Sequence, residues 1–220
     1  MNDKEKARII AEKILEKYYV EPSWSKGLSL FELLVAIILS QRTYWKNTRR
    51  ALERLRERYR SPREIAESSI DEIAETIKPA GLYREKARII RELAHMVVDK
   101  KIVLEEIVKL PYHEARKKLL SIKGVGLKTA DVFLMLAAEH PIVPVDTHIA
   151  RIAKRTGIVD EKAGYDEIRS ILEEAVDPGK RRSLHLALIM FGRSICKPRN
   201  PQCNICPIRE LCKYAQIRMV

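Results

Sequence analysis

Hydrophobic residues recur along this chain at intervals of three and four, the spacing of an amphipathic α-helix. Near the N-terminus the pattern runs from Ala7 to about Tyr19, where Pro22 and Gly27 interrupt it. Residues 30–40 are apolar on nearly every side, which predicts a helix running through the centre of a bundle. Further helices are expected over the ranges 46–59, 62–68, 70–77, 84–99 and 111–121.

No segment shows the strict alternation of polar and apolar residues that is typical of a β-strand. The nearest candidate is 142–145, but Pro144 cannot donate a hydrogen bond to a neighbouring strand, so we expect a connector there. The longest apolar runs, 33–39 and 132–138, are far shorter than the roughly 20 residues that cross a bilayer. The sequence therefore predicts an all-α fold without a membrane span.

Two hexamers of related sequence each lie between expected helices. Both 77–82 and 122–127 begin with Ile-Lys and end with Gly-Leu, which we interpret as the turns of a duplicated helix-hairpin-helix unit. The glycines of the second turn allow backbone N–H groups to face outward, where the next helix dipole also favours a phosphate. The simpler alternative is that Gly124 and Gly126 only end one helix and begin another.

The amino-acid composition of the chain indicates what class of partner it binds. The chain has 220 residues, with 42 Lys and Arg against 30 Asp and Glu, which gives a formal charge of +12. Such an excess favours a polyanion, and the charge alone leaves DNA, RNA and anionic membranes open. A membrane surface is disfavoured because no basic amphipathic segment stands free of the predicted core. The first residues lack the apolar run of a signal peptide, so we expect a cytoplasmic protein.

Two residues have positions suited to catalysis. Lys128 falls in the first turn of the helix expected after the second hexamer, where the helix dipole and partial burial should lower its pKa. A neutral amine at this place can act as a nucleophile. Asp146 precedes an amphipathic helix and is a natural N-cap, with a second oxygen left for a nearby cleft. The simpler interpretations are a solvated lysine and a capping aspartate, and we expect His148 to pack or hydrogen-bond.

The cysteines of the chain lie together near its C-terminal end, as Cys196, Cys203, Cys206 and Cys212. In a reducing compartment such a group favours a metal or cluster over disulfides. Their spacing leaves zinc and an iron–sulfur cluster open, because only one close pair is present. Between the first two cysteines, Lys197 and Arg199 belong to a loop that either grips a DNA phosphate or stays solvated.

These motifs together resemble the endonuclease III branch of the helix-hairpin-helix DNA glycosylases. The matching segments follow the family's order along almost the whole chain: 39–41, 81–83, 124–130, 145–149 and the cysteine group. The resemblance implies that Lys128 is the Schiff-base lysine and Asp146 the essential aspartate. It implies that Gln41 fills the gap left by an extruded nucleotide. It also implies that the cysteines hold a [4Fe–4S] cluster rather than zinc.

The implied activity is removal of a damaged base, an oxidised pyrimidine, from double-stranded DNA, followed by Schiff-base cleavage of the abasic site. The expected DNA contacts are Gln41, Arg42, Gly124, Val125, Gly126, Thr129, Lys197 and Arg199. The implied architecture is a helical domain of residues 27–133 and a discontinuous cluster domain of 1–26 plus 134–220, with the active site in a cleft between them. We expect a monomer, associated with the nucleoid of a prokaryote.

One departure from the family concerns the substrate. Where its Gln-x-Thr segment usually continues with an acidic residue, this chain has Tyr44 and Trp45. These aromatic residues line the base pocket, stack on DNA or pack between helices. A glycosylase for mismatched thymine, mismatched uracil or alkylated bases is therefore an alternative. A non-catalytic DNA-binding protein is a second alternative, although it would need neither Lys128 nor Asp146.

Overall fold

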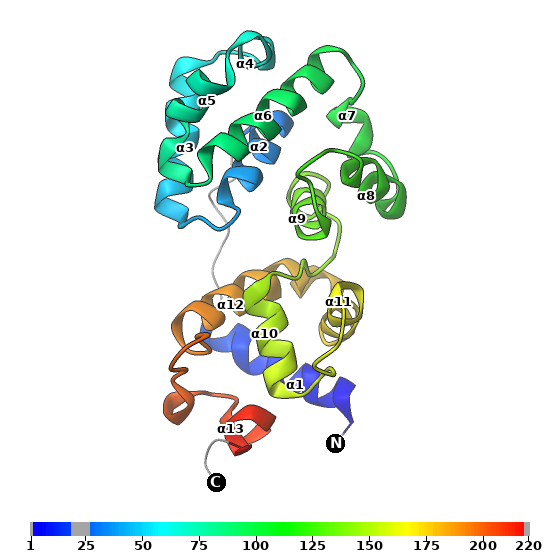
Figure 1. Cartoon of the computed structure of the whole chain (residues 1–220). Helices are drawn as coiled ribbons and strands as arrows, with labels where there is room; N and C mark the ends of the chain where they lie inside the picture. The colour runs from blue at the N-terminus through cyan, green and yellow to red at the C-terminus, as the bar shows by residue number, and fades with distance from the viewer. Residues whose placement is uncertain (1, 19–26, 218–220) are drawn as a thin grey trace. The chain divides into compact units, whose positions relative to one another are not determined.

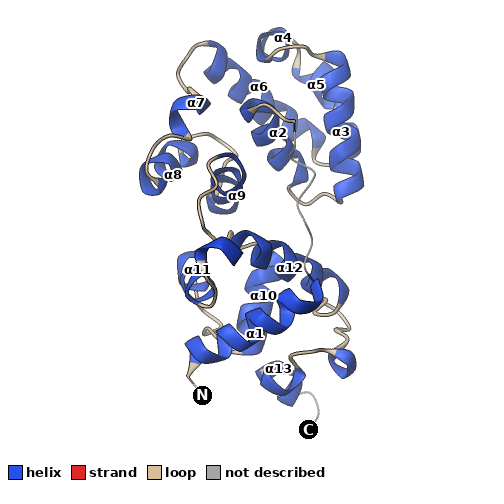
Figure 2. Ribbon diagram, turned by 180° about the vertical axis from the view of Figure 1, so that it is seen from behind, coloured by secondary structure: helices blue, strands red, loops and turns tan. Residues whose placement is uncertain are grey.

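The computed structural model describes residues 2–18 and 27–217. These residues form helices joined by turns and loops, and no strand occurs among them (Figures 1 and 2). They divide into two compact units, 27–140 and 2–18 together with 141–217. The all-α prediction is confirmed. The expected domain boundary near residue 133 falls inside a helix, and the domain bounds derived from the resemblance stay a prediction.

The unit of residues 27–140 is built around one apolar helix. Its helices are α2 (Leu30–Ser40), α3 (Trp45–Arg58), α4 (Pro62–Glu67), α5 (Ile70–Thr76), α6 (Tyr83–Val98), α7 (Leu104–Ile107), α8 (Tyr112–Leu120) and α9 (Leu127–Ala137). Every residue of α2 from Leu33 to Leu39 is buried. Ser29 and Glu32 form a reciprocal capping box that fixes where α2 begins. The prediction of a central helix is confirmed, and the other expected ranges agree with the structure to within two residues.

Both related hexamers join helices, as predicted. The first, 77–82, leads from α5 to α6 through a short 3-10 turn, η1 (Lys78–Ala80), and Gly81 has a φ of +63°. The second, 122–127, leads from α8 to α9, and Gly124 has a φ of +81°. Each turn thus uses glycine in the left-handed region, where residues with a Cβ are disfavoured.

The other unit combines the N-terminal helix with the C-terminal third of the chain. Its elements are α1 (Asp3–Tyr18), α10 (Thr147–Thr156), α11 (Tyr165–Glu174), η2 (Pro178–Lys180), α12 (Arg181–Ser194), η3 (Cys203–Ile205), η4 (Arg209–Leu211) and α13 (Lys213–Ile217). Helix α1 packs on α11 and α12, and α10 packs on α12 and α13. The predicted breaks near Tyr19 and Pro22 lie outside the described residues. None of the described helices combines the length and apolar character of a membrane span.

Residues 141–146 form a connector without regular secondary structure rather than a strand, as predicted. Side chains satisfy its backbone polar groups: Val143 N donates to Glu173 Oε1 at 3.0 Å, and Val145 N donates to the Tyr165 hydroxyl at 3.2 Å. The carbonyl of Pro144 lies 2.8 Å from His185 Nδ1. Because buried backbone groups need such partners, these contacts allow the connector to cross the interior without a sheet. The connector ends at Asp146, where α10 begins.

Candidate active site and nucleic-acid interface

The turn 122–127 presents the start of α9 as a site for an anion. Gly126 is the N-cap of α9 and has an extended backbone with a φ of −92°. It carries no side chain that could accept from the first N–H groups of the helix. These groups and the positive end of the helix dipole therefore favour a negatively charged ligand such as a phosphate. The side chains of Val125 and Thr129 are buried, so these two residues can reach DNA only through their backbone.

The two glycines of this turn should respond differently to substitution. At Gly124, a Cβ would lie 2.6 to 2.9 Å from three side-chain carbons of the buried Ile89, and φ is positive. We expect Gly124→Ala to lower the unfolding free energy by about 3 kcal/mol. At Gly126 no described atom lies within 4 Å of a Cβ. Gly126→Ala should therefore change stability by less than about 0.5 kcal/mol, while its methyl group hinders a phosphate and weakens binding of a short duplex.

Urea unfolding and a duplex titration check both expectations. Equal stability of the two variants would contradict the described turn. Unchanged duplex affinity of Gly126→Ala would remove the phosphate-binding role from the start of α9.

Gln41 follows α2 and is bound to the second turn through its side chain. Its Nε2 donates to the Gly124 carbonyl and to Thr129 Oγ1, both at 3.1 Å. The structure thus brings together three of the residues predicted to contact DNA. The next residue, Arg42, is exposed and has a φ of +52°, which residues other than glycine seldom adopt. The end of α2 is therefore fixed against the hairpin and presents a cation to the surface.

Large apolar side chains are exposed on the unit of residues 27–140. Tyr44 is 58% exposed, Trp45 is 50% exposed, and their ring centroids lie 6.2 Å apart. The interpretation that they pack between helices is therefore wrong. Leu82, at the end of the first turn, is 53% exposed and has a φ of +47°. The sequence pattern singled out the aromatic pair but gave no sign that Leu82 faces outward.

Lys86 of α6 is a site residue that the sequence reasoning missed. Its side chain is buried, and its Nζ lies 2.7 to 2.9 Å from four oxygen atoms: Leu39 O, Gln41 O, Thr43 Oγ1 and Ala80 O. Burial lowers the pKa of Lys86 to about 8. The sequence did contain a sign that this lysine is buried, because Lys86 lies on the same helix face as the apolar residues Ile90 and Leu93, four and seven positions later.

Lys128 is the second residue of α9 and is partly buried, as the sequence predicted. One turn later, the fully buried Asp131 accepts hydrogen bonds from the Tyr112 hydroxyl at 2.8 Å and from Arg116 Nε at 3.0 Å. Both partners belong to α8, so this buried ion pair fastens the two helices of the hairpin together. These contacts therefore hold the start of α9, which carries Lys128, against α8. Sequence reasoning missed Asp131, although a carboxylate within the apolar run of α9 was visible.

Asp146 caps α10, which confirms its simpler interpretation. Its Oδ1 accepts from the backbone N–H of His148 at 2.8 Å and of Ile149 at 2.9 Å. No hydrogen bond to Oδ2 occurs among the described residues, and the residue is partly exposed. Asp146 can therefore cap the helix and still offer one oxygen to a ligand. His148 packs against Gly192 and lies 3.1 Å from Arg151 through Nδ1, so it has the packing role that we expected.

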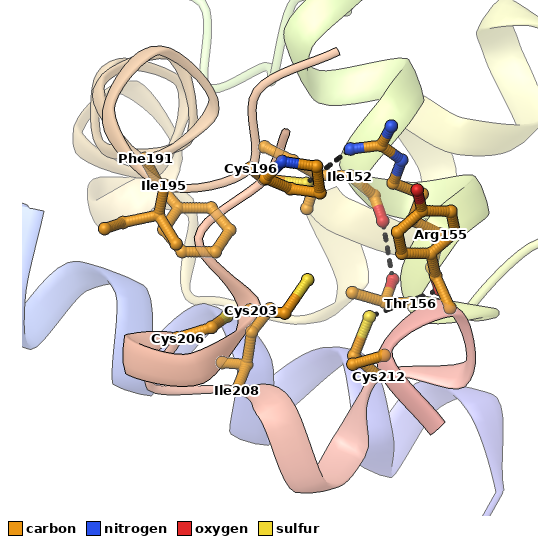
Figure 3. Close-up of a pocket in the computed structure, with 13 residues that line it drawn as sticks. Ile152, Arg155, Thr156, Phe191, Ile195, Cys196, Cys203, Cys206, Ile208 and Cys212 are labelled. Atoms are coloured by element: carbon orange, nitrogen blue, oxygen red, sulfur yellow. Dashed lines mark hydrogen bonds between the residues drawn. The ribbon is translucent and has the colours of Figure 1, made fainter. Parts of the chain in front are cut away.

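The cysteine thiols line one cavity in the unit that contains Asp146 (Figure 3). Apolar side chains form much of its wall, including Ile152, Phe191 and Ile208. Burial, together with the neighbouring cysteines, raises the pKa of Cys206 to about 11. Burial also raises the pKa of Cys212. Thiolates gathered in such a place repel one another unless cations offset their charge, so this set of donors fits a bound metal or metal cluster.

Two arginines of α10 hold the segment that begins at the first cysteine. Arg151 Nε donates to the Cys196 carbonyl at 2.9 Å. Arg155 donates to the carbonyls of Lys197 at 2.7 Å and Pro198 at 2.9 Å, and it lies over the Tyr214 ring at 4.4 Å. The helix that Asp146 caps is thus joined directly to the cysteine segment.

The loop that follows Cys196 is pinned at both ends. Arg155 holds its start, and Gln202 N donates to the Ile195 carbonyl at 3.0 Å. Within it, Arg199 is exposed and Lys197 is partly exposed. These two predicted DNA contacts therefore lie in a loop of fixed shape, in the same unit as Asp146, whereas Lys128, Gln41 and the hairpin belong to residues 27–140.

Two family models match the segments of the chain that contain the predicted site residues. The family model of HhH-GPD superfamily base excision DNA repair proteins matches residues 35–178, which include Gln41, Lys128 and Asp146. The iron–sulfur binding domain of endonuclease III matches residues 196–212, which begin and end at the first and last cysteine. The predicted [4Fe–4S] cluster is thereby confirmed, and the cysteines that line the cavity are the residues that would hold it.

Similar proteins extend over the whole chain. Endonuclease III of Thermotoga maritima is 33% identical over 214 residues, which are 95% of this chain and 93% of the relative. The structure of a non-covalent endonuclease III–DNA complex has a TM-score of 0.86 and 31% identity, covering 100% of this chain and 99% of the other. A trapped endonuclease III–DNA covalent intermediate has a TM-score of 0.81 and 31% identity, covering 97% and 96%. From its motifs, its fold and these matches, the chain belongs to the HhH-GPD superfamily of base excision DNA repair proteins, in the endonuclease III branch that carries an iron–sulfur cluster.

Proposed function

We propose that this protein is a bifunctional DNA glycosylase, which removes a damaged base from double-stranded DNA and then cleaves the strand at the abasic site. The observation that carries the proposal is a partly buried lysine in the first turn of a helix whose N-terminus is open to a phosphate. Similar chains were solved as a complex with DNA and as a trapped covalent intermediate with DNA, which supports both binding and covalent chemistry.

Binding precedes chemistry. The start of α9 would hold one backbone phosphate, and the pinned loop with Lys197 and Arg199 would hold another. Neither contact reads a base edge, so both suit an enzyme that must scan DNA of any sequence. The net charge of +12 supports the same mode of binding.

Extrusion of the damaged nucleotide costs a few kcal/mol and is easiest where pairing is already weak. The exposed Leu82 is our first candidate to occupy the gap left in the duplex, because apolar side chains wedged between base steps stabilise unstacked DNA. Gln41 is the second candidate, which the resemblance to the family implies. Tyr44 and Trp45 offer aromatic surface on the same unit, where an unstacked base could stack.

The chemical step uses one amine and one carboxylate. The neutral Nζ of Lys128 attacks C1′ of the deoxyribose, the C1′–N bond breaks, and the departing base takes up a proton. The sugar ring opens to a protonated Schiff base on Lys128. Loss of a C2′ proton then expels the 3′ phosphate by β-elimination. Asp146, through Oδ2, stabilises the positive charge that develops on the sugar and assists these proton transfers.

The [4Fe–4S] cluster, when bound, ties the cysteine thiolates into one rigid group. We propose that the cluster serves DNA binding by holding the loop of residues 197–202 in one conformation. The protein would act as a monomer on DNA in the cytoplasm.

A panel of duplexes, each with a single lesion, tests the function and the substrate together. Oxidised pyrimidine and abasic duplexes should be cleaved at least about tenfold faster than duplexes with mismatched thymine, mismatched uracil or an alkylated purine. Faster action on mismatched thymine would reassign the substrate and leave the mechanism in place. Absence of cleavage on every duplex, the abasic one included, would refute the proposed function in favour of a DNA-binding protein.

A further inference from the structure

We infer that Lys86 is a positioning residue, whose buried ammonium locks residues 41–43 and the turn 80–82 into one unit for insertion into DNA. This inference rests on the proposed function, because it concerns the step in which a nucleotide is extruded. It assigns a task to a lysine that neither binds the phosphate nor attacks the sugar.

The contacts of Lys86 join two segments that are distant in sequence. Its Nζ lies 2.8 Å from the carbonyl of Gln41 and 2.9 Å from the carbonyl of Ala80. Thr43 provides a second link, since its hydroxyl lies 2.7 Å from the same Nζ, 3.0 Å from the Gln41 carbonyl and within hydrogen-bond distance of the Ala80 carbonyl. One ammonium and one hydroxyl thus fasten both backbones at the same point.

The residues next to these fastened carbonyls are those that face outward. Arg42 follows Gln41, and Leu82 follows Ala80 after one glycine. Both Arg42 and Leu82 have positive φ, at +52° and +47°, although neither is glycine. Such conformations persist only where the surrounding structure imposes them, and they gather at functional sites. The network around Lys86 is what imposes them here.

The charge of Lys86 is needed for this task. A neutral amine has two N–H donors and a lone pair, whereas the ammonium has three donors for the four oxygens around it. The Leu39 carbonyl belongs to the last turn of α2, where the helix dipole favours a cation. Burial lowers the pKa of Lys86 to about 8, so the ammonium still predominates at neutral pH. An uncharged side chain in this place would remove the ammonium partner of the buried Leu39 carbonyl and leave the Thr43 hydroxyl as the remaining link between the two segments.

The test compares Lys86→Met, Lys86→Arg and Thr43→Val with wild type, and with Lys109→Met, which alters an exposed lysine of the same unit. The probe is a duplex with a reduced abasic site and 2-aminopurine on the opposite strand, whose fluorescence rises when the base loses its stacking partners. Three quantities are measured: the Kd for an undamaged duplex, the fluorescence rise, and single-turnover cleavage of an abasic duplex.

Lys86→Met should bind the undamaged duplex within about twofold of wild type but lose the fluorescence rise and about 100-fold in cleavage rate. Lys86→Arg keeps a charged donor in this place and should cleave faster than Lys86→Met. Lys109→Met should match wild type. A purely structural role would instead weaken all three quantities together and would overturn the inference, as would a fluorescence rise that survives in Lys86→Met.

If Lys86→Met does not fold, Thr43→Val decides the matter. It removes the second link and one of the four oxygens around Lys86 Nζ, and it should lower the fluorescence rise and the cleavage rate by about threefold to tenfold at unchanged duplex affinity. Full retention of both would overturn the inference. Wild-type protein that cleaves no duplex would refute the proposed function, and the fluorescence measurements, which need no cleavage, would still decide the role of Lys86.

Discussion

Lys128→Gln should abolish strand cleavage at abasic sites and the covalent adduct that borohydride traps, while the Kd for an abasic-site duplex stays within about threefold. Glutamine has almost the length of lysine and keeps the first turn of α9 helical, but its amide cannot attack C1′. Removing a covalent nucleophile should lower the cleavage rate by about 10⁴-fold or more. Denaturing gels of borohydride-treated mixtures and a binding titration measure the two effects separately.

The matched control is Lys118→Gln, which changes an exposed lysine of the preceding helix α8. It should trap and cleave like wild type. Trapping that persists in Lys128→Gln would show that another amine forms the Schiff base. Loss of duplex binding together with trapping would mean that Lys128 serves the phosphate site rather than the chemistry.

Asp146→Asn should slow base release about 100-fold or more and leave the fold almost unchanged. Asparagine caps helices as well as aspartate does, so the bonds from His148 and Ile149 to the side-chain oxygen should remain. The unfolding free energy is therefore expected to fall by less than about 0.5 kcal/mol. What is lost is the negative charge that faces the developing positive charge on the sugar. Single-turnover rates and urea unfolding measure the two quantities.

Asp146→Ala separates capping from catalysis. It should lose about 1 kcal/mol of stability with the cap and should slow base release as much as Asp146→Asn does. If Asp146→Asn keeps wild-type turnover while Asp146→Ala loses stability, the residue only caps α10 and the catalytic assignment is wrong.

Helices with strong local patterns could be predicted from the sequence. Because α2 has apolar residues on nearly every face, the sequence predicted both its range and its central position in the bundle. Pro144 correctly indicated a connector instead of a strand. Short elements could not be predicted: α7 spans only Leu104–Ile107, and η3 lies among the cysteines. A single turn has too few hydrogen bonds to specify itself, so its existence depends on packing that the local sequence does not encode.

The candidate site residues that lie in a recognisable sequence motif could be predicted from the sequence. Lys128 is in the first turn of a helix, Asp146 is an N-cap, and the cysteines line one cavity, all as the local patterns indicated. The sequence could not predict that Lys86 joins two segments of the chain, because one of its hydrogen-bond partners is 47 residues away. Three of its four partners are also backbone carbonyls, which carry no sequence signal. Arg151 and Arg155 were likewise hidden among 42 basic residues, and only the folded chain shows that they hold the cysteine segment.

The most direct test of the mechanism is to find which amine carries the sugar. Wild-type protein is mixed with an abasic duplex, reduced with borohydride, digested with nuclease and protease, and the modified peptide is sequenced by mass spectrometry. The proposed mechanism predicts a deoxyribose remnant on Nζ of Lys128. A remnant on Lys86, the buried amine whose pKa is lowered to about 8, or on any other amine would contradict it.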